Sequence, residues 1–322
     1  MKTIVGTNRY SGAPLEIVLS EVPEGFVYRS LEEQSEACLL AEAAEADYLL
    51  AGGRLKIGRS VLERAGKLKM IQRSGVGLDS LDLTAIREAG VPLYVNQGVN
   101  AESVAEYALL LILACLRRLT AIDADTKNGV WKKQEQGVRT AELKGKTVGI
   151  VGMGNVARTL VGLLAPFRVK ILYCDIKPCD PGFEQANGMR FTSLEELLGS
   201  SDVVTIHCAL TEDTRHMIRE ETIRRMKDGA ILVNTARGEI VDAADTAAAL
   251  SSGKLSFAGL DVHGREPIPD DYPLKGLENV ILTPHIGGVT NESFRGMMRA
   301  AFRNIRRFER GELEEIAQFR YL

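Results

Sequence analysis

The stretch Val148-Gly149-Ile150-Val151-Gly152-Met153-Gly154-Asn155-Val156-Ala157 decides the fold, because an apolar run passes through the pattern G-x-G-x-x-A into a helical segment. Gly152 allows a tight turn, Gly154 lets a pyrophosphate approach the backbone, and the small Ala157 lets the helix pack on the strand. The free amides at the helix start would face the anion. Glycine turns of this kind also serve packing alone, so the flanking sequence has to decide.

The next apolar run supplies that context. Residues 169–174 predict a strand that ends at Asp175, twenty-one residues after Gly154. A carboxylate at this place accepts hydrogen bonds from an adenosine ribose diol. It would also repel a 2′-phosphate, which favours NAD(H), whereas Lys177 close by leaves residual NADP(H) use open. We therefore predict a dinucleotide site that prefers NAD.

Strand-like and helix-like segments alternate along the rest of the chain, which is typical of parallel sheets covered on both faces. Before the glycine turn, helical patterns at 62–69 and 81–89 separate apolar runs at 47–51, 70–73 and 92–96. After it, strands are expected at 203–207, 230–234, 256–261 and 279–283. The predicted fold is α/β, with a Rossmann-type doubly wound parallel sheet.

Three further segments complete the outline. Asn100 can cap a long helix from Ala101 to about Leu119, and a polar stretch at 120–144 contains the only tryptophan, Trp131. Near the C-terminus, apolar residues recur at helical spacing and predict an amphipathic helix: Phe294, Met297, Met298, Ala301, Phe302, Ile305 and Phe308. A stripe of arginines on this helix is interpreted as a solvated face rather than a nucleic-acid patch.

Composition excludes several function classes. Among 322 residues, 40 Lys and Arg stand against 43 Asp and Glu, so the chain has no global attraction for nucleic acid or anionic membranes. The most apolar stretch, 108–116, is far shorter than the ~20 residues that span a bilayer. Five scattered cysteines without a CxxC pair predict core thiols and no metal site. With no signal-peptide pattern at the start, we expect a cytoplasmic protein.

Two charged residues follow predicted strands, at the sheet edge where open α/β folds bind ligands. Arg237 follows the strand at 230–234 and can grip a carboxylate with two parallel hydrogen bonds, or pair with a neighbouring acid. His285 follows the strand at 279–283, although a lone His near glycines is more often structural. His207 ends another strand, with a structural role equally plausible; His216 and His263 carry no signal.

Together these segments resemble the D-isomer-specific 2-hydroxyacid dehydrogenase family. The resemblance runs from about Met70 to Gly288 through six motifs in order. They are Gly75-Val76-Gly77-Leu78-Asp79-Ser80-Leu81-Asp82, Ser103-Val104-Ala105-Glu106, the glycine turn, Thr235-Ala236-Arg237-Gly238, the segment from Asp261-Val262 to Glu266-Pro267, and Pro284-His285-Ile286-Gly287-Gly288.

The resemblance implies a catalytic set of Arg237, Glu266 and His285. His285 would take the C2 hydroxyl proton as general base, or donate one during ketone reduction, since its unperturbed pKa near 6.5 suits both directions. Glu266 would hold the imidazole tautomer. Arg237 would clamp the substrate carboxylate and polarise the carbonyl, while the hydride passes between C2 and nicotinamide.

The resemblance also implies the binding residues. Backbone amides of Gly75, Val76 and Gly77 would meet the substrate carboxylate, together with Arg237 and His285. Around the cofactor, NAD, the family pattern places Gly152, Gly154, Asn155, Val156, Asp175, Cys208, Thr235, Ala236, Asp261, Gly287 and Gly288.

Family topology implies a discontinuous substrate domain, flavodoxin-like, formed by 1–98 and 289–322. The NAD-binding Rossmann domain, 99–288, would be inserted into it. The active site would lie in the cleft between the domains. The segment at about 100–145 resembles the family's dimerisation arm, so a homodimer is expected.

Substrate identity stays open at this stage. The expected reaction is hydride transfer between C2 of a small 2-hydroxy acid and nicotinamide, with glycerate, glyoxylate or 3-phosphoglycerate as candidate substrates. Arg54, Lys56 and Arg73 are candidate cations for a phosphate. The alternative is an NAD(H)-gated interaction protein of the corepressor type with little catalysis. Nothing like a disordered recruitment tail follows residue 322, and we therefore expect an enzyme.

Overall fold

The computed structural model describes residues 1–53 and 55–322. They form two compact units, one of Met1–Asn100 with Thr290–Leu322 and one of Ala101–Val289. The candidate phosphate cation Arg54 lies outside the described residues. Each unit is built on its own parallel sheet, which confirms the predicted α/β class.

The sheet of the first unit has the order β2-β1-β3-β4-β5, all parallel, the flavodoxin-like order. Its strands are β1 (Lys2–Gly6), β2 (Phe26–Ser30), β3 (Tyr48–Ala51), β4 (Met70–Arg73) and β5 (Leu93–Tyr94). The central strands β3 and β4 are buried along their whole length. This explains why they appear in the sequence as unbroken apolar runs.

Helices cover both faces of this sheet. They are α1 (Ala13–Glu21), α2 (Glu36–Ala43), α3 (Arg59–Arg64), α4 (Leu83–Glu88) and α13 (Asn291–Glu309). Leu39, Val61 and Ile86 from α2, α3 and α4 pack in one cluster, whereas Val18 of α1 and Phe302 of α13 pack in the other. The predicted C-terminal amphipathic helix therefore completes the first unit from a distant part of the chain.

The sheet of the second unit has the order β12-β11-β10-β9-β6-β7-β8, again all parallel. Its strands are β6 (Thr147–Val151), β7 (Lys170–Cys174), β8 (Met189–Phe191), β9 (Val203–Ile206), β10 (Ala230–Asn234), β11 (Leu255–Leu260) and β12 (Val280–Leu282). After β6 the chain adds β7 and β8 on one side, and it then crosses to the other side of β6 to add β9. Ligands bind at such a switch point in doubly wound folds. The glycine turn follows β6 and therefore lies at this point.

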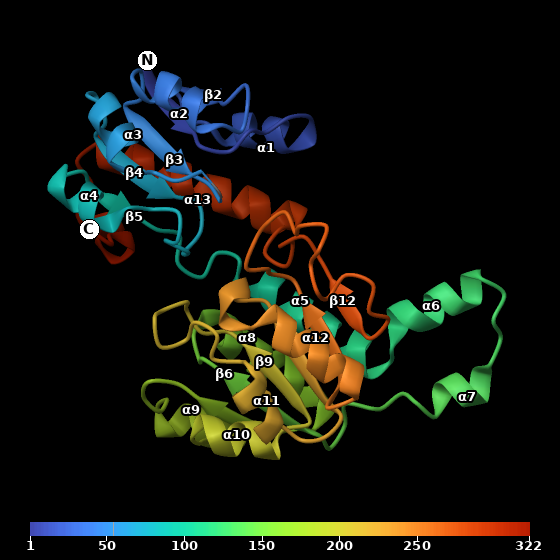
Figure 1. The fold of residues 1–322 in the computed structure, drawn as a ribbon. Helices are drawn as coiled ribbons and strands as arrows, with labels where there is room; N and C mark the ends of the chain where they lie inside the picture. The colour runs from blue at the N-terminus through green and yellow to red at the C-terminus, as the bar shows by residue number, and fades with distance from the viewer. Residues whose placement is uncertain (54) are drawn as a thin grey trace. The chain divides into compact units, whose positions relative to one another are not determined.

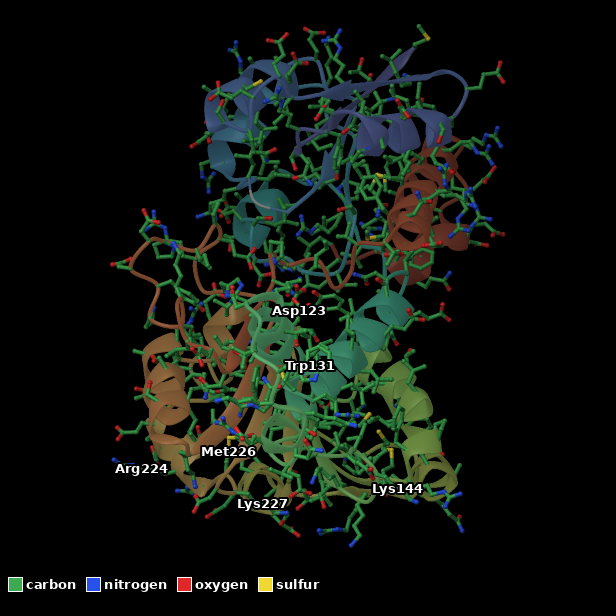
Figure 2. All side chains as sticks on the ribbon, turned by 90° about the vertical axis from the view of Figure 1, so that its right-hand side faces the viewer. Asp123, Trp131, Lys144, Arg224, Met226 and Lys227 are labelled. Atoms are coloured by element: carbon green, nitrogen blue, oxygen red, sulfur yellow. The ribbon has the colours of Figure 1, made fainter. Side chains whose placement is uncertain are left out.

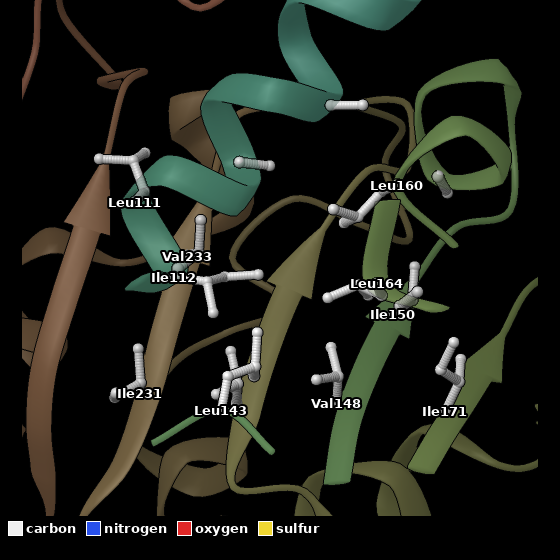
Figure 3. Packing of buried hydrophobic residues seen from close by; sticks show 14 of the residues in the cluster. Leu111, Ile112, Leu143, Val148, Ile150, Leu160, Leu164, Ile171, Ile231 and Val233 are labelled. Atoms are coloured by element: carbon white, nitrogen blue, oxygen red, sulfur yellow. The ribbon is translucent and has the colours of Figure 1, made fainter. Parts of the chain in front are cut away.

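Helices flank both faces of the second sheet as well (Figure 1). They are α5 (Ala101–Leu116), α8 (Asn155–Leu164), α9 (Pro181–Asn187), α10 (Leu194–Ser200), α11 (Glu220–Arg225) and α12 (Ala243–Ser252). Figure 3 shows one face, where Leu111 and Ile112 of α5 and Leu160 of α8 pack over Val148 and Ile231 of the sheet. Residues of α10, α11 and α12 pack on the opposite face.

A short arm extends from this unit. The predicted helix to Leu119 instead stops at Leu116, because Arg118 adopts a left-handed conformation with φ of 48° and starts α6 (Leu119–Lys127). After α6 comes α7 (Lys133–Gly137), and both stand out from the rest of the unit at the right of Figure 1. In Figure 2 this arm, with Trp131 labelled, faces the viewer.

One predicted helix is misplaced. The pattern at 62–69 falls on α3, which spans Arg59–Arg64 and is followed by a turn. Leu68 still packs against the core from outside the helix. The apolar spacing therefore predicted the burial of Leu68 correctly, but it did not predict where the helix ends.

Candidate functional site

The turn after β6 strongly favours glycine at position 152. Gly152 has φ of 89°, and a Cβ there would lie 2.6 Å from the amide nitrogen of Cys208. At Gly154, by contrast, φ is −78° and a Cβ would meet no atom within 4 Å. The missing side chain of Gly154 therefore keeps open space beside the helix start, the space that a pyrophosphate would need.

The N-cap of the helix that follows, α8, is Gly154, and within the described residues no side chain caps the first amides from this position. Asn155 and Val156 thus present first-turn amides, which carry the positive end of the helix dipole and favour an anion. Ala157 is completely buried, so the helix packs closely on the sheet. That these residues hold a pyrophosphate stays a prediction.

Asp175 directly follows β7 at the same edge. Its carboxylate accepts hydrogen bonds from the amides of Met153 and Ile176, both at 2.6 Å, and remains exposed. The first contact ties the carboxylate to the middle of the glycine turn. An exposed carboxylate held there suits a ribose diol.

Two further predicted cofactor residues border the edge. Cys208 follows β9, with its backbone against Gly152. Thr235 follows β10, and its hydroxyl is buried without a hydrogen-bond partner in the part of the chain that the structure describes. A buried, unsatisfied hydroxyl costs free energy unless a ligand or water satisfies it. The residues at this edge therefore fit a bound dinucleotide.

Arg237 lies on the loop after β10. Asn234 fixes this loop by accepting from the amide of Ala236 and donating to the carbonyl of Arg237, at 2.9 and 2.8 Å. Gly238 packs directly on the backbone of His263, since a Cβ at Gly238 would lie 2.0 Å from that residue's carbonyl carbon. The loop that carries Arg237 therefore adjoins the loop that carries Glu266.

Glu266 and His285 are brought together. The two carboxylate oxygens of Glu266 lie 3.1 and 3.0 Å from Nδ1 of His285. Glu266 is mostly buried, with 19% of its side chain exposed, whereas 45% of the His285 side chain is exposed. With Nδ1–H donating to the carboxylate, Nε2 is left to exchange a proton with a ligand.

The turn that carries His285 is held by a buried carboxylate. Asp261 accepts from the Thr283 hydroxyl and the Ile286 amide through Oδ1, and from the Gly287 amide through Oδ2. From α5, the Ser103 hydroxyl donates to the Gly287 carbonyl at 2.8 Å. Asp261 and Gly287 thus position the turn. Their predicted cofactor contacts, with those of Ala236 and Gly288, stay predictions.

The loop with Gly75, Val76 and Gly77 lies in the first unit, after β4. Asn96 holds it by donating to the carbonyls of Gly75 and Ser74, at 3.1 and 3.0 Å. Val76 is half exposed at 50%. The predicted substrate contacts of these amides stay a prediction.

Of the candidate phosphate cations, Arg73 is buried. Its guanidinium donates to the carbonyl of Gly77 at 2.6 Å, to that of Ala51 at 3.2 Å, and to that of Gly52. This places Arg73 in a structural role for the loop. Lys56 is exposed.

Three further titratable side chains lie near this edge, His207, Cys174 and Cys208. Burial lowers the pKa of His207 to about 4, and Nε2 of His207 lies 2.9 Å from the Thr205 hydroxyl. Burial also raises the pKa of the Cys174 thiol to about 12 and that of Cys208 to about 11. These cysteines are therefore weak nucleophiles. Sequence reasoning missed His263, a buried residue beside Glu266, because nothing near it in the chain indicates its contacts.

Comparison with known families identifies residues 109–287 as matching the model described as D-isomer specific 2-hydroxyacid dehydrogenase, NAD binding domain. A glyoxylate reductase of Thermofilum pendens is 39% identical over 85% of this chain and 82% of its own length. A hydroxypyruvate reductase of Thermotoga maritima is 38% identical over 78% of this chain and 81% of its own.

Solved structures agree. A D-lactate dehydrogenase from Aquifex aeolicus, complexed with NAD and lactic acid, matches with a TM-score of 0.85 and 28% identity. The alignment covers 99% of this chain and 98% of that one. Within residues 1–53 and 55–322, no helix is long and apolar enough to cross a membrane.

Proposed function

The chain belongs to the D-isomer-specific 2-hydroxyacid dehydrogenase family and is an NAD-dependent oxidoreductase acting on CH–OH groups, and we propose that Arg237, Glu266 and His285 carry its chemistry. The observation that supports this most is the hydrogen-bonded pair of Glu266 and His285. A carboxylate on Nδ1 is the arrangement that prepares an imidazole for proton transfer at Nε2.

In the direction of reduction, bound NADH supplies the hydride for C2 of the 2-keto acid. His285 donates the proton from Nε2 to the carbonyl oxygen, and in the reverse direction takes the proton back from the hydroxyl. Glu266 stabilises the imidazolium form and fixes the ring orientation.

Arg237 binds the substrate in this proposal. Its guanidinium can hold a carboxylate through two parallel hydrogen bonds, which orients C2 for hydride transfer. Support comes from the loop of Arg237, which the Asn234 side chain holds through the amide of Ala236 and the carbonyl of Arg237. Gly238 sets this loop against the backbone of His263 and Gly264.

We propose glyoxylate or hydroxypyruvate as the substrate, in line with the reductases named above. The buried Arg73 argues against a phosphorylated acid, because its guanidinium already donates to three main-chain carbonyls. NADH oxidation with glyoxylate, hydroxypyruvate, pyruvate and 3-phosphohydroxypyruvate tests this. Preference for 3-phosphohydroxypyruvate would refute the substrate proposal. Absence of turnover with all four acids would refute the proposed catalytic role of Arg237, Glu266 and His285.

A homodimer is also proposed, through the arm of α6 and α7. Support comes from its exposed apolar side chains, Trp131 at 81% and Val138 at 83%, which are costly to leave in water. Analytical ultracentrifugation of wild type and Trp131→Ser with Val138→Ser should show a dimer that the double variant weakens. A monomeric wild type would contradict this.

Finally, we propose a cytoplasmic location. Its support is that the cysteines Cys38, Cys115, Cys174, Cys179 and Cys208 are all free thiols. Fractionation of the source cells, with the protein detected by antibody, tests it. Recovery outside the cytoplasmic fraction would contradict it.

A further inference from the structure

We propose that His263 is a positioning residue that locks Glu266 and His285 into one geometry. This inference rests on the proposed function of that pair. His263 is only 7% exposed and lies three residues before Glu266, on the loop after β11. Its backbone amide bonds to Glu266, and its ring bonds to the carbonyl of Thr283, which also accepts from the His285 amide.

The ring of His263 has a defined tautomer. Its Nε2 lies 2.9 Å from the carbonyl oxygen of Thr283, which can only accept, so Nε2 carries the proton. Its Nδ1 lies 3.2 Å from the hydroxyl of Tyr272 and accepts from it. Burial, followed by the charge of Glu266, raises the pKa of Tyr272, so this hydroxyl keeps its proton to donate. The Nε2–H tautomer thus satisfies both neighbours.

These contacts close a ring of hydrogen bonds. The backbone amide of His263 donates to Oε1 of Glu266 at 3.1 Å. The Thr283 carbonyl that accepts from the His263 ring also accepts from the amide of His285 at 3.0 Å. His285 then returns to Glu266 through Nδ1. His263 therefore connects to both members of the pair by separate routes.

The backbone of His285 explains why such a brace is needed. Its φ is 59°, a left-handed conformation that costs a residue with a side chain free energy unless the surroundings enforce it. The His285 amide is held by the carbonyls of Asp261 at 2.7 Å and Thr283 at 3.0 Å. Because His263 fixes the second carbonyl, it helps to hold this conformation.

The Tyr272 ring supports His263 from the side. The two rings meet edge to face, with centroids 5.5 Å apart and planes at 87°. The phenyl ring of His263→Phe can therefore keep this packing and lose both hydrogen bonds. His263→Gln keeps a donor that can reach Thr283, and Tyr272→Phe removes one hydroxyl.

Steady-state reduction of the best 2-keto acid by these variants tests the proposal, with His216→Asn as a matched control. His216 is a half-exposed histidine whose Nδ1 lies 3.1 Å from Asp242. We expect His263→Phe to lower kcat about tenfold. We expect KM and the Kd of NADH to change less than twofold, and His263→Gln to recover most of the loss. Equal kcat in His263→Phe and wild type would overturn the proposal.

A second readout is independent of turnover. NMR of protein labelled with ¹⁵N-histidine should show His263 as the Nε2–H tautomer, and the Nδ1 proton of His285 protected from exchange. His263→Phe should speed that exchange at least fivefold. If the wild type reduces no 2-keto acid, the proposed function fails while this exchange still reports on His263. If His263→Phe does not fold, Tyr272→Phe and His263→Gln are measured instead, and unchanged exchange and kcat in both would overturn the inference.

Discussion

Oε1 and Oε2 of Glu266 lie 3.1 and 3.0 Å from Nδ1 of His285, so one imidazole nitrogen faces both carboxylate oxygens. The residues are 19 positions apart and come from the loops after β11 and β12. Parallel strands end at the same edge of a sheet, and this brings the two loops together. The arrangement leaves Nε2 of His285 available for the proton transfer that we propose.

The glycine turn predicts a contrast between two alanine variants. Gly152→Ala should destabilise the protein by about 2 kcal/mol or more, because the residue has φ of 89° and its Cβ would meet the backbone of Cys208. Gly154→Ala should fold with little change in Tm, since its Cβ meets open space. It should nevertheless weaken NADH binding at least tenfold by filling that space. Thermal melts and fluorescence titration with NADH measure both; wild-type NADH affinity in Gly154→Ala would show that the turn does not hold the pyrophosphate.

The preference for NADH over NADPH should depend on the two residues directly after β7. Asp175 is exposed and Ile176 is fully so at 101%. The double variant Asp175→Ser with Ile176→Arg removes the charge that repels a 2′-phosphate and adds a cation. We expect the ratio of kcat/KM for NADH over NADPH to fall at least tenfold. An unchanged ratio would mean that the ribose binds elsewhere.

The acid sensitivity of folding should depend in part on His207. Its folded pKa of about 4 lies below the ordinary value of 6.5, so below pH 6.5 the unfolded chain binds more protons than the folded one. The stability contribution of this group is therefore present at neutral pH and is lost as pH falls toward 4. Between pH 7.5 and 5 the loss should be about 2 kcal/mol.

His207→Gln should lack this contribution, because glutamine does not titrate and can still bond to the Thr205 hydroxyl. Urea unfolding of both proteins at pH 7.5 and pH 5 measures the difference, in which all other titrating groups cancel. An equal decline of the free energy of unfolding in both proteins would place the acid sensitivity in other residues.

Sequence patterns located the buried parallel strands well. The apolar run at 70–73 and the predicted strand at 230–234 coincide with β4 and β10, and the apolar run that begins at Val148 lies within β6. These strands are covered on both faces, and so they appear as continuous apolar runs between turns. Helix ends were harder to place: the left-handed Arg118 that divides α5 from α6 has no local signature, since arginine rarely adopts that conformation.

The contacts within the candidate site were less predictable than the strands. Strand ends located Arg237 and His285 at the carboxyl edge, whereas their roles came from the family resemblance. His263 was not predictable, because its partners Thr283 and Tyr272 lie 20 and 9 positions away. Only the folded arrangement of the loops after β11 and β12 shows that its amide bonds to Glu266 and that its ring bonds to the Thr283 carbonyl, which also accepts from the His285 amide.

The most direct measurement is a single-turnover reaction of the enzyme–NADH complex with glyoxylate or hydroxypyruvate, comparing wild type with His285→Ala. Wild type should oxidise its bound NADH. His285→Ala should do so at least ~100-fold more slowly, because the general acid is gone, with an NADH Kd within about twofold of wild type. Equal rates in the two proteins would contradict the assignment of His285. Absence of oxidation in a wild type that still binds NADH tightly would favour an NAD(H)-gated interaction protein.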